Sequence, residues 1–154
     1  MAYLIREATR DDLPVLKTFE QGIIAYERPF DPTLRPDPIS YYDIGEMIDS
    51  AEATVIVAES EGEVVASGYA KKKPSSSYAM PTYHAFLGMM FVRPEHRGKG
   101  VNGRVLNALL DWARRNDLPE VHLTVYPEND SARNAYLKAG FKPHILEMRM
   151  NIDD

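Results

Sequence analysis

Apolar residues recur along the chain at two spacings, which together predict its secondary structure. Alternation of apolar and polar positions is typical of strands, whereas spacings of three and four residues place side chains on one helix face. Apolar stretches predict strands over residues 3–7, 54–59, 63–70, 83–92, 121–125 and 145–152. Helical spacing predicts helices over residues 9–27, 40–50, 100–115 and 131–139. This order predicts a mixed α/β protein, with helices on the faces of one sheet.

Residues at the element boundaries agree with these ranges. Thr9 and Asp12 have the spacing of a capping box at a helix start. Gly140, with Lys138 in the preceding turn, is typical of a helix end. Glu61 and Gly62 separate two apolar stretches and predict a hairpin. Four prolines within residues 29–38 predict a stiff loop between the first two helices.

The composition excludes several classes of protein. A length of 154 residues fits a single domain over 1–154, and the absence of cysteine excludes a disulfide scaffold. The four histidines are widely spaced, so no metal site is expected. A net charge of −5 disfavours nucleic-acid binding, no apolar stretch is long enough to span a membrane, and the charged start is unlike a signal peptide. We therefore expect a soluble cytoplasmic protein with no nucleic-acid or membrane partner. Whether it forms a homodimer is not decided by the sequence.

The charge is unevenly distributed along the chain. Residues 27–61 carry nine acidic and two basic side chains, whereas residues 62–154 carry a net charge of +3. Solvated surface is the ordinary explanation for such runs. A second explanation is that the protein has two surfaces with opposite electrostatic preferences.

A glycine-rich turn follows the longest predicted strand. Residues 91–103 read FVRPEHRGKGVNG, so a strand ends, a proline turns the chain, and glycines open a helix. A helix start presents unpaired N–H groups and a partial positive charge, and glycine lets an anion approach the backbone closely. The four basic residues nearby, Arg93, Arg97, Lys99 and Arg104, strengthen the prediction of a pyrophosphate site. The spacing fits neither a P-loop nor the context of a dinucleotide fingerprint.

These residues resemble the acetyl-CoA-binding motif of the GNAT (GCN5-related) N-acetyltransferases. A second stretch, NDSARNAYLKAGF at residues 129–141, is similar to the family signature N-x-x-A-x-x-x-Y-x-x-x-G-F. Glu95 and Asn102 depart from the first motif, where the family usually has Arg or Gln and Gly or Ala. The resemblance implies a GNAT-like fold with a mixed, mostly antiparallel sheet of six to seven strands and about four helices. It also implies that acetyl-CoA contacts Phe91, Val92, Arg97, Gly98, Lys99, Gly100, Val101, Asn102, Asn129 and Tyr136.

The resemblance further assigns chemistry to a tyrosine. Tyr136 would act as the general acid that protonates the departing CoA thiolate, and a phenol with a pKa of about 10 suits that role. The alternative is that Tyr136 is a core residue on the apolar face of its helix and has no catalytic role. Asn129 would help to hold the cofactor, and the backbone of residues 90–92 would pair with the pantetheine amides and polarise the thioester carbonyl.

The sequence alone does not identify the residue that removes the amine proton. Glu27 ends the first helix and His84 begins the long strand, and these are the two catalytic candidates carried forward. Asp31, Glu20 and bulk water are further alternatives, since Leu87 or Gly88 stands where the family commonly has a glutamate.

The sequence therefore predicts an acetyl-CoA-dependent N-acetyltransferase that acts on a primary amine within a ternary complex. The acidic stretch at residues 27–61 favours a cationic acceptor, either a small molecule or a peptide amine. A non-catalytic CoA-binding domain and a nucleotide-phosphate binder are the two competing hypotheses.

Overall fold

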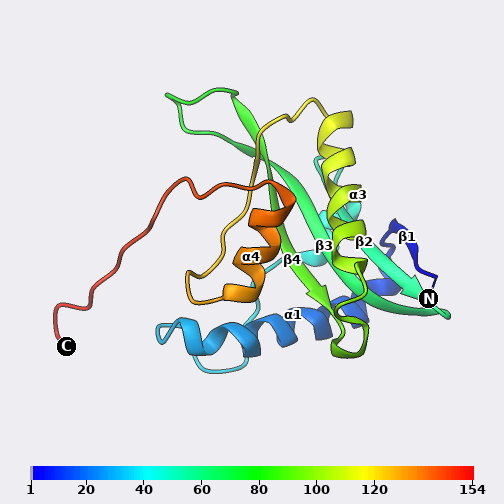
Figure 1. Ribbon diagram of the computed structural model, residues 1–154, viewed down its shortest axis with the longest axis horizontal. Helices are drawn as coiled ribbons and strands as arrows, with labels where there is room; N and C mark the ends of the chain where they lie inside the picture. Colours follow the sequence, from blue (N-terminus) through cyan, green and yellow to red (C-terminus); the bar gives the residue numbers. More distant parts are fainter. Residues whose placement is uncertain (1) are drawn as a thin grey trace. The chain divides into compact units, whose positions relative to one another are not determined.

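Five strands form one sheet within residues 2–154, which are the residues that this computed structural model describes (Figure 1). The strands lie in the order β1-β2-β3-β4-β5, with β1 to β4 antiparallel and β5 parallel to β4. Their bounds are Leu4–Glu7, Ala53–Ser60, Glu63–Pro74, Tyr83–Val92 and Val121–His122. The α-helices α1 to α4 span Leu13–Glu27, Ile44–Asp49, Val101–Arg115 and Asp130–Ala139. This mixed and mostly antiparallel architecture confirms the predicted fold class.

Local sequence signals place the helix and hairpin boundaries. Thr9 and Asp12 form the predicted capping box before α1, and the Asp43 side chain accepts the Glu46 N–H at the start of α2. Glu61 and Gly62 turn the β2–β3 hairpin with φ angles of 52° and 80°. Both angles lie in the left-handed region that a tight two-residue hairpin requires.

Helices cover both faces of the sheet. A Cβ added at Gly68 of β3 would meet Leu109 and Val105 of α3, so Gly68 faces α3. Its neighbour Tyr69 belongs instead to the core cluster with Phe19 of α1, because consecutive strand residues point to opposite faces. The fully buried or nearly buried members of that core cluster are Leu16, Phe19, Ile44, Met47, Val55, Val57, Tyr69 and Met89. The core therefore joins α1 and α2 to the middle of the sheet.

The chain divides into two compact units. One runs up to Thr124 and contains the whole sheet with α1 to α3, and the other is Val125–Asp154 and contains α4. Whether they act as the single predicted domain stays a prediction. No described helix is long and apolar enough to cross a membrane.

Two strand predictions need correction. Residues 145–152 have the alternation of a strand, but no ladder forms there among residues 2–154, and the strand at 121–125 is reduced to Val121–His122. A strand is defined by hydrogen bonds to a neighbour, and periodicity does not supply that neighbour. The predicted six to seven strands are therefore five in the described chain.

Candidate functional site

The strand β4 carries a β-bulge at its centre. Tyr69 pairs with Gly88 and Ser67 pairs with Phe91, so two residues of β4 stand opposite Gly68 alone. One of these two, Met89, has a φ of 53°, which is rare for a residue with a side chain. The buried Ser67 hydroxyl donates to the Met89 carbonyl over 3.0 Å and fixes the distorted backbone. Such bulges re-aim backbone groups and are frequent next to active sites.

The carboxylate of Glu27 lies half-buried among tyrosines beside this bulge. Burial raises the pKa of Glu27 above its usual value, and the neighbouring Tyr41 side chain opposes that shift. The pKa of Tyr42 is also raised, first by burial and then by the nearby Tyr69 and Glu27, while a backbone hydrogen bond with Met89 lowers it. The four side chains of Glu27, Tyr41, Tyr42 and Tyr69 are called the tyrosine cluster below. The cluster connects the end of α1 to the bulge of β4.

A second carboxylate on α1 holds the tyrosine cluster in place. Glu20 is only 3% exposed and accepts the backbone N–H groups of Tyr41 and Tyr42, each over 2.8 Å. The Gln21 side chain also donates to the Ile39 carbonyl over 2.9 Å. The ring of Tyr42 meets that of Tyr69 edge to face, with 5.4 Å between the centroids. Glu20 is thus committed to positioning the loop, which removes it from the candidate bases.

The loop and α1 border a groove of about 920 Å³. Tyr41 and Tyr42 line the groove together with the buried Glu20. Its other charged residues are the basic Arg10 and Lys17 and the acidic residues Asp43 and Glu46. The groove therefore combines a buried carboxylate with a surface of mixed charge.

The glycine-rich turn has the backbone that the sequence predicts. Gly98 and Gly100 have φ angles of 75° and 78°, and a Cβ added at Gly98, Gly100 or Gly103 would meet open space. Gly100 caps the start of α3, and the first helical bond there runs from the Arg104 N–H to the Gly100 carbonyl. The N–H groups before Arg104 thus have no partner within the helix. The turn is an open, left-handed cradle at a positive helix end, which suits a pyrophosphate.

The remaining turn residues divide between structure and solvent. Arg97 donates from Nε to the Val92 carbonyl over 3.0 Å, which folds the turn back onto the end of β4. Lys99 is exposed, Asn102 lies half-buried in the first turn of α3, and Val101 is buried in the core. On the other side of β4, β5 pairs only with Ala85 and Phe86. Phe91 and Val92 therefore have no β5 partner, and their backbone could pair with an extended ligand.

His84 occupies a structural position at the start of β4. It is 8% exposed, its Nδ1 lies 2.9 Å from the Ser75 hydroxyl, and its ring stacks on His122 at 4.0 Å between centroids. Burial, followed by His122 and Lys73, lowers the pKa of His84, and Glu120 opposes that shift. His84 lies four residues before Gly88, which is about 13 Å along a strand. His84 is therefore separate from the tyrosine cluster.

The other predicted site residues lie on the second unit. Asn129 caps α4 by accepting the Ala132 N–H over 3.3 Å, so its side chain has a helix-capping role. Tyr136 is half-buried on α4, and its ring meets Phe141 edge to face at 5.7 Å. Both positions agree with the predicted helix. Asp31, an alternative base, accepts from the Thr33 backbone and hydroxyl and stabilises its own loop.

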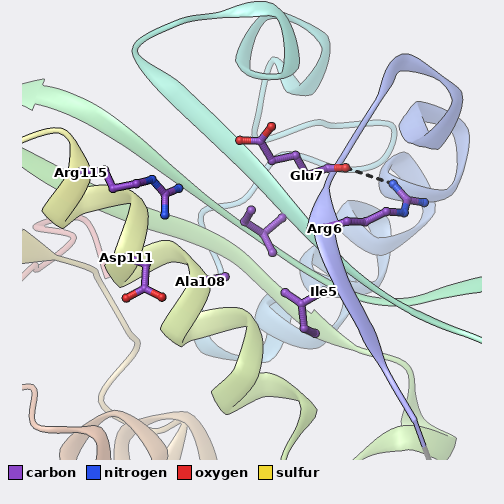
Figure 2. A pocket seen from close by; sticks show the side chains of 7 residues that line it. Ile5, Arg6, Glu7, Ala108, Asp111 and Arg115 are labelled. Atoms are coloured by element: carbon purple, nitrogen blue, oxygen red, sulfur yellow. Dashed lines mark hydrogen bonds between the residues drawn. The ribbon is translucent and has the colours of Figure 1, made fainter.

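A smaller hollow of about 280 Å³ lies between β1, β2 and α3 and contains none of these residues. Figure 2 shows Ile5 and Ala108 at this hollow, with Arg6 pointing away from Asp111 and Arg115. Arg6 is held by Asp12 and Glu59 and also donates to the Glu7 carbonyl. The Arg6 side chain at this hollow is therefore already engaged by ion pairs with Asp12 and Glu59.

The sequence prediction missed the three tyrosines of the cluster. One signal was present, because a glycine inside a strand often marks a close approach. A Cβ at Gly88 would lie 2.6 Å from the Tyr69 ring, so Gly88 leaves the space that Tyr69 fills. Tyr41 and Tyr42 gave no comparable signal, since their positions depend on Glu20 from a distant part of the chain.

Comparisons with known proteins agree on a family. The family model described as the acetyltransferase (GNAT) family matches residues 19–141. Two Bacillus subtilis relatives are the uncharacterized N-acetyltransferases YobR, 40% identical over 37% of this chain, and YhfO, 30% identical over 62% of this chain. The matches span 23% of YobR and 62% of YhfO, less than two thirds of either relative.

Solved structures share the fold at low sequence identity. The BH1408 protein of Bacillus halodurans has a TM-score of 0.85 at 15% identity, covering 97% of this chain and 99% of its own. A predicted acetyltransferase of Clostridium acetobutylicum, solved with acetyl-CoA, has a TM-score of 0.73 at 16% identity over 98% and 97% of the two chains. The aminoglycoside N-acetyltransferase AAC(6')-Iy, solved with CoA, has a TM-score of 0.72 at 16% identity over 96% and 99%.

Proposed function

This chain belongs to the acetyltransferase (GNAT) family, and we propose that it transfers the acetyl group of acetyl-CoA directly to a primary amine. The observation that carries the proposal is the half-buried Glu27 carboxylate near Tyr42, whose ring also reaches the backbone of Met89 in the β4 bulge. An amine attacks only as the free base, so its proton must be removed. A carboxylate with a raised pKa, near the strand whose backbone would polarise the thioester carbonyl, is suited to accept that proton.

The donor would bind along β4 and the glycine-rich turn. The N–H groups at Gly98, Gly100 and Val101, with Arg97, Lys99 and Asn102 nearby, would hold the pyrophosphate. The open space above the glycines is what a close phosphate approach needs. The backbone at Phe91 and Val92 would pair with the pantetheine amides, as an added strand would. Among the structural neighbours, the Clostridium acetobutylicum protein was solved with acetyl-CoA.

The reaction would proceed without a covalent enzyme intermediate. The amine nitrogen attacks the thioester carbonyl carbon, Glu27 accepts the amine proton, and the carbon–sulfur bond breaks to release the CoA thiolate. Tyr136 would donate its phenolic proton to that sulfur, and Asn129 would hold the start of its helix. The products are the acetylated amine and CoA. His84 has no part in this scheme, because its ring is engaged with Ser75 and His122.

We infer that the acceptor is a cationic amine. The inference rests on Glu27 and its aromatic surroundings, and the total charge of residues 27–61 is not needed for it. Most acids in that range have structural partners: Asp31 with Thr33, Asp37 with Arg28, Asp43 with Glu46, Asp49 with Arg10 and Glu59 with Arg6. Glu27 is the acid that the tyrosine cluster presents. Aromatic rings around one carboxylate suit an ammonium group, which tyrosine faces also attract. AAC(6')-Iy, an aminoglycoside N-acetyltransferase, shares the fold.

A binding and turnover experiment tests the proposal. Acetyl-CoA should raise the melting temperature, and thiol release should be fastest with cationic amines in a panel that includes neutral and acidic ones. Binding without thiol release from any amine would replace the proposal with a non-catalytic CoA-binding domain. Equal competition by ATP or NAD would favour a general phosphate binder.

A glycine pair supplies matched variants for the donor site. Gly100→Ala and Gly62→Ala both place a side chain at a left-handed φ with open space around it. Both should therefore destabilise the fold by a similar amount, about 1 kcal/mol. Only Gly100→Ala should weaken acetyl-CoA binding, and equal binding by both variants would contradict the assigned cradle.

A further inference from the structure

The glycine-rich turn crosses one end of the sheet before α3 begins. Val92, the last residue of β4, pairs with Ala66 near the start of β3, and Leu4, the first residue of β1, pairs with Glu59 near the end of β2. These ends lie at the same end of the sheet, although β2 and β3 separate β1 from β4 by about 14 Å. The short 3-10 helix η3, Pro94–His96, continues from β4 at this end.

A tyrosine that precedes β1 contacts the last residue of η3. The Tyr3 hydroxyl lies 3.0 Å from Nδ1 of His96, and the two rings meet edge to face with 5.7 Å between their centroids. Tyr3 is 9% exposed, His96 is half-buried, and both belong to the sheet-containing unit. A hydroxyl can donate or accept, so this hydrogen bond forms with either tautomer of the imidazole. The contact therefore ties η3 to a segment 93 positions away in the chain.

The residue before η3 is fixed to the sheet as well. The Arg93 N–H donates to the Val65 carbonyl over 2.8 Å, and Nε of Arg93 donates to the Val64 carbonyl over 3.0 Å. Both carbonyls belong to β3. The backbone N–H of His96 then donates to the Arg93 carbonyl over 2.9 Å. The helix η3 is therefore held to β3 at its start and to Tyr3 at its end.

The residues that would hold the pyrophosphate follow directly after His96. They are Arg97, Gly98, Lys99 and Gly100, and a Cβ added at either glycine would meet open space. Glycine has more backbone freedom than any other residue, so ordering such a turn around an anion costs conformational entropy. His96 before the glycines and the buried Val101 after them restrict that freedom from both sides. A turn restricted in advance loses less entropy when its ligand binds.

We propose that Tyr3 is a positioning residue for the donor, because through His96 it holds the glycine-rich turn in the shape that receives the pyrophosphate of acetyl-CoA. The effect passes through His96, so it requires no contact between Tyr3 and the donor. This inference rests on the donor site of the proposed function. It adds to that site a residue that neither of the two family motifs contains.

Removal of the Tyr3 hydroxyl tests the proposal. Tyr3→Phe keeps the ring and loses the hydrogen bond, so the KM for acetyl-CoA should rise about threefold to tenfold while kcat stays nearly the same. The matched control is Ser75→Ala, which also removes a hydroxyl from a hydroxyl–imidazole pair, since Oγ of Ser75 lies 2.9 Å from Nδ1 of His84. This control should leave the KM for acetyl-CoA within about twofold of the wild type. Thiol release measures the KM, and titration calorimetry measures the dissociation constant of acetyl-CoA.

A shortened donor separates an effect on the turn from a general weakening of the fold. S-acetylpantetheine carries the thioester and the pantetheine amides but no pyrophosphate. Tyr3→Phe should therefore lower kcat/KM about threefold to tenfold for acetyl-CoA and by less than about twofold for S-acetylpantetheine. Equal losses with the two donors would overturn the proposal, because they would place the effect outside the pyrophosphate site.

Variants of His96 test whether Tyr3 acts through it. His96→Leu removes the hydrogen-bonding atom and should raise the dissociation constant of acetyl-CoA about as much as Tyr3→Phe does. The double variant should bind no more weakly than either single one, because both remove the same contact. His96→Asn keeps a polar atom close to the position of Nδ1 and should stay within about twofold of the wild type. Losses that add in the double variant would overturn the proposal.

The same titrations separate this inference from the proposed function. A wild-type chain that binds no acetyl-CoA would refute the donor site and, with it, the role of Tyr3. Equal binding of acetyl-CoA by the wild type and Tyr3→Phe would refute the role of Tyr3 alone. Circular dichroism checks that each variant is folded.

Discussion

The tyrosine cluster and the C-terminal unit differ in how their side chains are held. In the cluster, Glu20 fixes the loop, Tyr42 packs on Tyr69, and the β4 bulge is tied by Ser67. In the C-terminal unit, α4 has no buried residue, and the apolar side chains of residues 145–152 are exposed. The side chains of the first region have their partners within the sheet-containing unit, which fixes their positions. The second has an equally regular pattern of apolar residues, yet no strand forms over residues 145–152 in the described chain.

Core truncation should separate the two regions most clearly. Phe19 is 2% exposed and stacks on Phe91 at 4.6 Å, so Phe19→Ala should lower the free energy of unfolding by about 3–5 kcal/mol. Leu137 of α4 is 46% exposed, and Leu137→Ala should change the free energy of unfolding by less than about 0.5 kcal/mol. Urea denaturation of both variants measures the difference. Equal losses would show that α4 is buried as deeply as the core.

Removal of the Glu27 charge should have the largest effect on catalysis. Glu27→Gln keeps the shape but cannot accept a proton, so kcat/KM should fall about 100-fold or more. In the wild type kcat/KM should fall as the pH drops through the raised pKa of Glu27, and this acid limb should vanish in the variant. Asp31→Asn is the matched control and should stay within about twofold. Similar activity of Glu27→Gln and wild type would transfer the base role to water.

The buried His84 should make stability depend on pH. Its pKa in the folded chain is lowered, so the unfolded chain binds the proton more readily. Stability should therefore be complete above about pH 6.5 and decline below it, by at most about 1.4 kcal/mol per pH unit. His84→Gln should flatten this part of the profile, whereas His144→Gln, on the exposed segment, should not. Chemical denaturation at a series of pH values provides the test.

The smallest expected effect concerns Tyr41 within the tyrosine cluster. The neighbouring Tyr41 side chain lowers the pKa of the Glu27 carboxyl, against the effect of burial. Tyr41→Phe should therefore move the acid limb of kcat/KM to higher pH, with kcat on the plateau nearly unchanged. Tyr83→Phe, at an exposed position, is the control. If the acid limb of kcat/KM moves to lower pH or does not move, Tyr41 does not lower the pKa of Glu27.

The glycine-rich turn could be predicted because its signals are local. Gly98 and Gly100 predict a turn at a helix start, and the structure has that turn with both glycines at positive φ. The capping box at Thr9 and the hairpin at Gly62 are local in the same sense. The surroundings of Glu27 and His84 could not be predicted from local signals. They depend on Ser75 and His122, which contact His84, and on Tyr41, which lies near Glu27.

The sequence by itself determined the element types, the glycine-rich turn and the membership of the family, because these depend on residues close together in the chain. The tertiary structure decided which partners each acidic side chain has. It placed Glu20 against two backbone N–H groups and Glu27, seven residues later, against a tyrosine. It also left residues 145–152 without a ladder. The physical reason is that burial and hydrogen-bond partners come from segments far apart in the chain, and periodicity does not record them.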